Sequence, residues 1–297
     1  MSRLILGCGY LGYRVAKIWQ KRGEQVFAVT RSDERRESFA RSGLQPILAD
    51  VTDADSLSPL RDLNDVQTVL VAIGMDRSRY DRVRDVYVEG LKNVLQQFSS
   101  DARPRHLIYV SSTGVYGDFG GEWVDESSKT EPVREGGQAC LEAEHLLKQS
   151  VLSDRTTILR FAGIYGPGRV PTRSTIESGS WSKLSADGFL NLIHVDDGAR
   201  LIEQLADEHA EAAGELYCVS DGHPVIRKDY YDQIAQELGL DSIPWTKVSV
   251  DQTKARSGSN KRVSNLKLTR QFDFSFEFED YRAGVRHSIG KDSSPPA

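Results

Sequence analysis

The sequence predicts an α/β fold: a doubly wound parallel sheet of the Rossmann type with a small C-terminal lobe. An apolar run at residues 4–6 leads directly into Gly7-x-Gly9-x-x-Gly12, and a helical pattern follows. Apolar strands then alternate with helical segments over the first half of the chain, as expected when βαβ units build a parallel sheet. The second half is less regular, which indicates a lobe built from insertions against that sheet.

Hydrophobic periodicity gives the elements of the first half in order. The first helix carries Leu11, Val15, Ile18 and Trp19 on one face. Further helices are expected at 33–41, 80–98 and 134–149, the last after an irregular stretch at 111–134. Strands are expected at 4–6, 25–29, 46–49, 66–73, 106–110 and 156–161. The run at 66–73 is apolar throughout, which suits a parallel sheet covered on both faces.

The second half contains weaker signals. Two segments look helical, 196–206 and 225–238, and two look like strands, 189–195 and 215–219. A polar, basic stretch at 251–264 is expected to be a loop.

The glycine turn carries the first functional signal. Gly7 allows a tight turn, Gly9 lets the backbone approach a pyrophosphate, and Gly12 lets the helix pack on the strand. The helix N-terminus offers N–H groups and a positive dipole end to phosphates. The segment therefore predicts dinucleotide binding through Gly7, Gly9, Tyr10, Leu11 and Gly12, and disfavours a purely structural α/β protein. The expected organisation is a dinucleotide-binding domain at 1–165, to which 188–220 returns, a lobe at 166–290 and a frayed tail at 291–297.

Composition excludes several classes of function. The 297 residues carry a formal net charge of −5, which favours neither nucleic acid nor an anionic membrane as a partner. The three cysteines are widely separated and indicate neither a disulfide framework nor a zinc site, so no metal is expected. No apolar run approaches the ~20 residues of a membrane span. Because a strand begins almost at once, we expect no signal peptide and a cytoplasmic location.

Five further segments, in order, resemble landmarks of the extended short-chain dehydrogenase/reductase superfamily, in its NAD-dependent epimerase/dehydratase group. The similarity covers nearly the whole chain, although the glycine spacing GxG departs from the GxxGxxG usual there. The landmarks are Ala49-Asp50-Val51-Thr52-Asp53, Val71-Ala72-Ile73-Gly74, Tyr109-Val110-Ser111-Ser112-Thr113-Gly114-Val115-Tyr116-Gly117, Leu159-Arg160-Phe161-Ala162-Gly163-Ile164-Tyr165-Gly166-Pro167-Gly168 and Ile193-His194-Val195-Asp196-Asp197-Gly198-Ala199.

The resemblance implies roles for some of these residues. Asp50 and Val51 would lie beside the adenine, and Ala72, Ile73 and Gly74 would end a strand under the cofactor. The C-terminal lobe would bind substrate. The family also allows a homodimer formed through the helices expected at 80–98 and 134–149.

The end of the second strand bears on the choice of cofactor. An acid there accepts hydrogen bonds from the 2′-hydroxyl of NAD, whereas a base favours the 2′-phosphate of NADP. The sequence reads Val29-Thr30-Arg31-Ser32, with no acid before Asp33. A guanidinium clasps phosphate in a bidentate manner. Arg31 and Ser32 therefore predict NADP in preference to NAD, against the alternative of a solvated basic helix start.

The residues that do chemistry in this family are incomplete here. Ser112 stands where the family keeps a catalytic hydroxyl. The Tyr-x-x-x-Lys pair should follow in the next helix, but Gly136 and Cys140 occupy those positions, and no tyrosine occurs between Tyr116 and Tyr165. Glycine cannot move a proton, and cysteine supplies no positive charge to lower a neighbouring pKa. The standard mechanism is therefore expected to be absent or strongly weakened.

Five other side chains are candidates to replace the missing tyrosine and lysine in proton transfer, although each of them also has a purely structural explanation. They are Tyr80, Tyr116, Glu135, Cys140 and Tyr165. The leading prediction is an atypical NAD(P)-dependent, epimerase/dehydratase-like oxidoreductase that uses Ser112 on a small, sugar-like metabolite. The rival is a non-catalytic NADP-binding protein that senses redox state or presents a surface to a partner.

Overall fold

The computed structural model describes residues 1–63, 65–98, 104–181, 184–241, 243–245 and 259–291. The chain divides into two compact units. Unit 1 comprises Met1–Val115, Arg134–Arg160 and Gly198–Tyr217. Unit 2 comprises Tyr116–Val133, Phe161–Asp197 and Cys218–Ala297.

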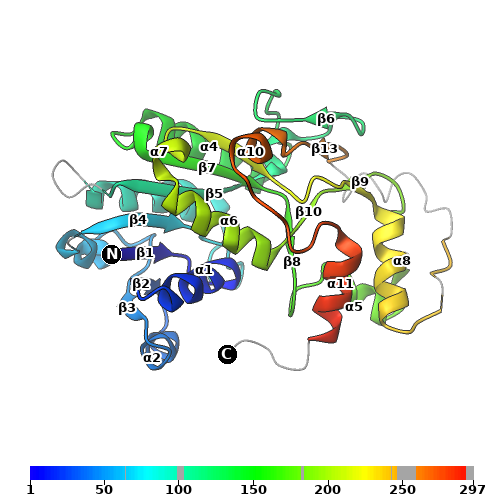
Figure 1. The fold of residues 1–297 in the computed structure, drawn as a ribbon, viewed down its shortest axis with the longest axis horizontal. Coiled ribbons are helices and arrows are strands. Elements are labelled where there is room, and N and C mark those ends of the chain that lie inside the picture. The colour runs from blue at the N-terminus through cyan, green and yellow to red at the C-terminus, as the bar shows by residue number, and fades with distance from the viewer. Residues whose placement is uncertain (64, 99–103, 182–183, 242, 246–258, 292–297) are drawn as a thin grey trace. The chain divides into compact units, whose positions relative to one another are not determined.

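A seven-stranded parallel sheet with the order β11-β7-β5-β4-β1-β2-β3 runs through unit 1, and β7 and β11 end in unit 2 (Figure 1). Because β1 has β2 on one side and β4 on the other, the strand order reverses between β1 and β4. In doubly wound sheets such a reversal opens a crevice at the carboxyl ends of the strands. The strands are β1 (Ser2–Leu6), β2 (Gln25–Thr30), β3 (Gln45–Leu48), β4 (Val66–Val71), β5 (His106–Ser112), β7 (Thr156–Phe161) and β11 (Leu216–Val219).

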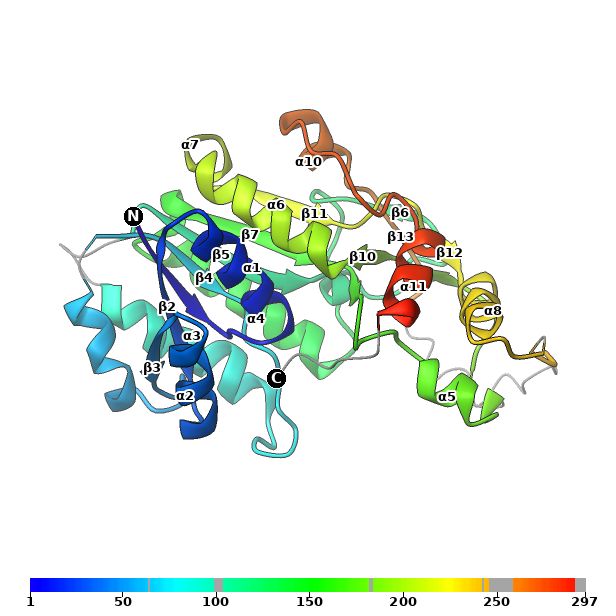
Figure 2. The ribbon, with the colours of Figure 1, turned by 60° about the horizontal axis from the view of Figure 1, so that its bottom comes forward.

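Helices cover the sheet on both faces, which explains the continuous apolar strands (Figure 2). α1 (Tyr10–Lys21) packs on β1 and β2, and Arg22, which caps the end of this helix, pairs with Asp207 at the end of α6 (Val195–Asp207) at 2.5 Å. The opposite side carries η2 (Asp85–Glu89), α3 (Gly90–Leu95) and α4 (Glu135–Gln149). Shorter helical elements of unit 1 are α2 (Asp33–Arg41), η1 (Asp55–Asp62), η3 (Gln96–Phe98), η5 (Ser153–Arg155) and α7 (His209–Ala212).

One predicted helix is wrong in its bounds. The segment 80–98 was expected to be a single helix, but its regular part is a π-helical turn, η2, followed by α3 and the 3₁₀ turn η3. Tyr80 instead ends a turn in which its N–H donates to the Asp76 carbonyl at 3.0 Å, and the Asp76 carboxylate accepts the Ser78 N–H at 3.1 Å and the Ser78 hydroxyl at 2.6 Å. Such local side-chain bonds compete with helix formation.

Unit 2 is built from short elements. β8 (Gly163–Tyr165) pairs in parallel with β10 (Leu192–His194), β9 (Phe189–Leu190) pairs with β12 (Val225–Ile226), and β6 (Trp123–Val124) pairs with β13 (Arg262–Val263). The remaining elements are η4 (Thr113–Tyr116, shared with unit 1), α5 (Arg173–Glu177), α8 (Arg227–Glu237), α10 (Leu266–Gln271) and α11 (Tyr281–Gly290).

Three predictions for unit 2 need correction. The strand expected at 189–195 is interrupted at Asn191, because that side chain donates to the Lys261 carbonyl and accepts the Val263 N–H. The helix expected at 225–238 begins at Arg227, after β12. The loop expected at 251–264 contains β13; its part up to residue 258, like the tail from 292, lies outside the described residues.

No helix among the described residues is both long and apolar enough to cross a membrane.

A buried ion pair connects α4 to the sheet within unit 1. The Glu144 carboxylate is fully buried and accepts hydrogen bonds from Arg160 on β7, at 2.6 Å from Nη2, and from the Ser111 hydroxyl on β5, at 2.6 Å. The Glu144 carboxylate on α4 therefore receives donors from two strands, β5 and β7, as a buried charged group requires.

Removal of Glu144 is expected to destabilise the protein strongly, because the buried Arg160 guanidinium would lose the carboxylate that it bonds through Nε and Nη2. Glu144→Ala should lower the free energy of unfolding by about 3–5 kcal/mol. The matched control is Glu142→Ala on the same helix, which removes an exposed pair with Arg84 and should cost about 0–1 kcal/mol. Denaturant unfolding measures both, and equal losses would contradict this assignment.

Candidate functional site

The glycine turn of unit 1 joins β1 to α1 and depends on missing side chains. Gly7 has φ +89°, and a Cβ there would lie 2.4 Å from the Ala72 carbonyl oxygen at the end of β4. A Cβ at Gly12 would lie 2.5 Å from the Gly7 carbonyl oxygen. These two glycines are therefore required for packing between β1, β4 and α1.

Gly9 differs from its two neighbours in the motif. A Cβ at Gly9 would have no heavy atom within 4 Å, so the backbone here faces open space. Gly9 is also the N-cap of α1, and no side chain caps this end of the helix. An uncapped helix N-terminus beside bare backbone fits the diphosphate of a dinucleotide. Tyr10 and Leu11 begin the helix at this point.

The end of β4 lies against the glycine turn. The Ala72 N–H donates to the Leu6 carbonyl at 2.8 Å, which continues the ladder between β1 and β4. Ile73 and Gly74 follow, and a Cβ at Gly74 would again meet open space. The next N–H, that of Met75, donates to the Tyr87 hydroxyl at 3.1 Å. Tyr87 is a neighbour of this segment that the sequence did not reveal, because periodicity places it on a helix but does not show which backbone it contacts.

Two arginines lie close to the end of β2. Arg31 is one-third exposed, pairs with Asp76 at 3.1 Å and lies over the Tyr80 ring. Arg35 reaches back from α2 and donates to the Cys8 carbonyl, inside the glycine turn, at 2.6 Å. Ser32 caps α2 by accepting the Arg35 N–H at 3.3 Å. The sequence predicted Arg31 and Ser32 as contacts; the structure places Arg35 with them, close to the end of β2.

Asp50 follows β3 and is held by several donors. Its carboxylate accepts hydrogen bonds from the Tyr80 hydroxyl and from the Thr52 N–H, and lies 3.5 Å from Arg79. Although partial burial alone would raise it, the hydrogen bonds from Tyr80 and Thr52 leave the pKa of Asp50 lowered. The adjacent Val51 is buried against Gly90, where a Cβ would lie 2.8 Å from the valine side chain.

Ser112 ends β5 next to the first turn of α4. Its Oγ accepts the Gly114 N–H at 3.0 Å, and a Cβ on Gly114 would contact both Ser112 Oγ and Gly137 Cα. The structure therefore brings Ser112 close to the helix turn that carries Gly136. A Cβ at Gly136, where the resemblance led us to expect the tyrosine, would have no heavy atom within 4 Å.

Cys140 lies one turn further along α4 and is 6% exposed. Burial, reinforced by the neighbouring Glu144 carboxylate, raises the pKa of the Cys140 thiol to about 12. The thiol is therefore protonated at neutral pH, and it offers neither a nucleophile nor the positive charge of a lysine.

The other side chains proposed to replace the missing tyrosine and lysine are buried or already engaged by neighbouring groups. In unit 2, Tyr116 is fully buried with its hydroxyl 2.9 Å from Cys218 Sγ, and burial raises the pKa of Tyr165. In unit 1, Tyr80 binds Asp50, and Glu135 accepts the Val83 N–H at 3.4 Å. None of these side chains stands out as a general base.

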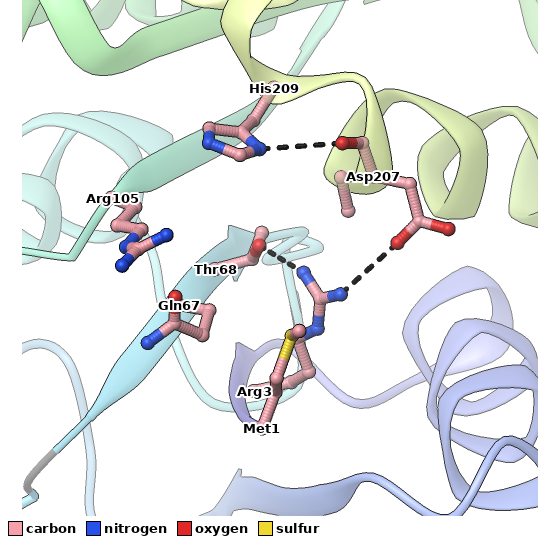
Figure 3. A pocket seen from close by; sticks show the side chains of 8 residues that line it. Met1, Arg3, Gln67, Thr68, Arg105, Asp207 and His209 are labelled. Carbon is pink, nitrogen blue, oxygen red and sulfur yellow. Dashed lines mark hydrogen bonds and ion pairs between the residues drawn. The ribbon is translucent and has the colours of Figure 1, made fainter.

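A cavity of about 170 Å³ lies elsewhere in unit 1 (Figure 3). It is lined by Arg3 on β1 and Thr68 on β4, together with Arg105, Asp207 and His209. These residues lie near the amino ends of the strands, whereas ligands of doubly wound sheets bind beyond the carboxyl ends. Arg3 is engaged there by Thr68 and by Asp207, at 3.3 Å from the latter. We do not assign this cavity to the dinucleotide.

Comparisons with known proteins give a consistent result. Residues 4–220 match the model of the NAD dependent epimerase/dehydratase family. The chain is 29% identical to protein YeeZ of Escherichia coli K12 over 93% of this chain and 96% of that protein. A solved protein of Methylobacillus flagellatus, provisionally described as an NAD-dependent epimerase/dehydratase, is 30% identical with a TM-score of 0.78, over 97% of each chain. The Bordetella bronchiseptica enzyme WbmG, solved with NAD and UDP, shares the fold at 19% identity and a TM-score of 0.77, over 97% of this chain and 93% of that one.

The environment of Asp50 predicts a pH dependence of stability. A carboxylate with a lowered folded-state pKa stabilises the fold fully above its unfolded pKa of about 3.9, and this contribution is lost as the pH falls through the folded value. Asp50→Asn should therefore be less stable than the parent at pH 7, and the difference should shrink in acid. Asp62→Asn, at an exposed carboxylate of the same unit, serves as the control. Denaturant unfolding across this pH range tests the prediction, and a difference independent of pH would refute it.

Proposed function

Given that the chain belongs to the NAD dependent epimerase/dehydratase family, we propose that it binds a nicotinamide dinucleotide at the glycine turn of unit 1 and prefers NADP(H). The observation that carries the proposal is the contrast among the motif glycines. Gly7 and Gly12 are needed for packing, whereas Gly9 is bare toward open space at an uncapped helix end. A glycine that packs against nothing is explained by a ligand that approaches the backbone.

The preference for NADP(H) rests on the end of β2. Arg31 and Arg35 bring two positive charges to the position where NAD-specific proteins carry an acid. Arg31 is already aligned on the Tyr80 ring, but its guanidinium is paired with Asp76. We propose that Arg31 exchanges Asp76 for the 2′-phosphate, while Arg35 keeps its bond to the Cys8 carbonyl and steadies the turn.

The proposed activity is a slow oxidoreduction of a small, sugar-like metabolite. A bound nicotinamide would supply or accept the hydride. Ser112 Oγ accepts the Gly114 N–H and would donate its own O–H to a substrate carbonyl oxygen. With glycine at position 136, the proton is taken from water in the open space there. Positioned acid–base groups contribute roughly 10²–10⁴-fold to rate, so turnover should be lower by about that factor than with a tyrosine present.

A second candidate is a non-catalytic NADP-binding protein that reports redox state to a partner. It is favoured by one combination: Gly136 carries no proton-transfer group, and the Cys140 thiol is buried and protonated. The two candidates share the same cofactor site and differ only in whether turnover occurs.

Arg31→Asp should weaken NADP⁺ binding by about ten- to a hundredfold, because charge-assisted bonds are each worth about 1.5–3 kcal/mol. NAD⁺ binding should change little or improve. Calorimetric titration of both nucleotides measures the effect, with Arg41→Ala at the far end of α2 as the matched control. Unchanged NADP⁺ affinity in the Arg31 variant would show that this arginine does not bind the 2′-phosphate.

Gly136→Tyr combined with Cys140→Lys should raise turnover on a panel of sugars by tenfold or more, because the first change fills open space and the second places an ammonium near Glu144. Ser112→Ala should abolish the turnover of both forms. Thermal unfolding confirms that the double variant remains folded. If the parent binds NADP(H) but neither it nor the folded double variant turns over any sugar, the sensor candidate replaces the oxidoreductase.

A further inference from the structure

Three potential metal ligands converge inside unit 2, apart from the dinucleotide site. His194 ends β10, Asp196 lies in the first turn of α6, and His287 lies on α11. One ligand atom from each of them lies within 4.8 Å of the other two. Within the part of the chain that the structure describes, this is the one such group of histidine, cysteine and carboxylate side chains.

Aromatic neighbours fix the first imidazole. His194 is fully buried, with the Phe278 ring 3.8 Å away between centroids and the Tyr165 ring in an edge contact at 5.3 Å. The His287 ring lies 5.6 Å from the His194 ring at an interplanar angle of 74°, and Phe278 also packs against it at 4.9 Å. Both imidazoles are thus oriented by packing before any ion arrives, which lowers the entropic cost of binding.

The distance between the candidate ligand atoms suits a small cation once the side chains shift slightly toward it. His194 Nδ1 and Asp196 Oδ2 are 3.7 Å apart. Tetrahedral zinc with bonds of about 2.0–2.1 Å separates its ligands by roughly 3.4 Å. His194 Nδ1 also receives the Asp196 N–H, but at a long 3.3 Å. Asp196 is half-buried, so its carboxylate has room to move toward an ion that the two imidazoles hold.

We propose that His194, Asp196 and His287 form a binding site for a divalent transition metal, with Zn²⁺ as the best match. Two imidazoles and one carboxylate are a donor set that zinc uses, and they leave a fourth position for water. Asp197, the next carboxylate, accepts the N–H groups of Glu277 and Phe278 and so holds the chain before α11 in place. The positive end of α6 opposes a cation, which weakens binding about two- to fivefold (about 0.3–1 kcal/mol).

The consequence for unit 2 is a cross-link. A metal held by these residues would join the β10–α6 junction to α11, two segments distant in sequence. An ion that binds only the folded protein stabilises it by mass action. The melting temperature should therefore rise with added Zn²⁺.

Competition for Zn²⁺ against a chromogenic chelator tests the site. The tag-free full chain, first stripped with EDTA, should bind one equivalent of Zn²⁺. Asp196→Asn and His287→Ala should each weaken this binding at least tenfold and abolish the Zn²⁺-dependent rise in melting temperature. His145→Ala, which removes an exposed histidine of unit 1, should behave like the parent. Two variants are used so that a folding defect in one leaves the other informative.

Two results would overturn the proposal. One is the absence of saturable Zn²⁺ binding by the parent. The other is binding of equal strength in the parent and in both folded site variants, which would mark the ion as adventitious. Neither result bears on the dinucleotide site, whose residues lie in unit 1.

Discussion

The close approach of two backbones at the strand-order reversal is the constraint on which the rest of unit 1 depends. Gly7 turns the chain out of β1 with a positive φ while lying against the carbonyl of Ala72 at the end of β4. Only a residue without a Cβ satisfies both conditions. The turn then delivers the amino end of α1 to the carboxyl edge of the sheet, and Gly12 lets the helix pack there. Bare amides at Gly9 follow directly from this geometry.

Helix α4 combines a buried charged network with positions that carry no proton-transfer group. The carboxylate of Glu144 still holds Ser111 and Arg160, so α4 is fixed to β5 and β7 by a buried charged network. One and two turns earlier on the same helix, Cys140 and Gly136 contribute neither charge nor a phenol. The contacts that hold α4 on the sheet are therefore present, whereas the side chains at positions 136 and 140 offer no group that moves a proton at neutral pH.

The fold could be predicted from the sequence where the local residue pattern and the tertiary structure agree. Apolar strands, the glycine turn and five ordered motifs predicted the doubly wound sheet and the family, and both are confirmed. The sequence was insufficient where a single side chain decides the backbone. The helix expected at 80–98 is divided into η2, α3 and η3, and Asn191 splits a strand by bonding to Lys261 and Val263. Periodicity contains no information on such contacts, nor on the convergence of His194 with His287.

The central claim is that a dinucleotide phosphate rests on the amides at the start of α1, and amide hydrogen exchange with and without NADP⁺ tests it most directly. We expect slower exchange for peptides covering residues 7–12 and 31–35 when nucleotide is added, with little change in α8 or α11 of unit 2. Unaltered exchange at residues 7–12 under conditions where the protein binds the nucleotide would contradict it.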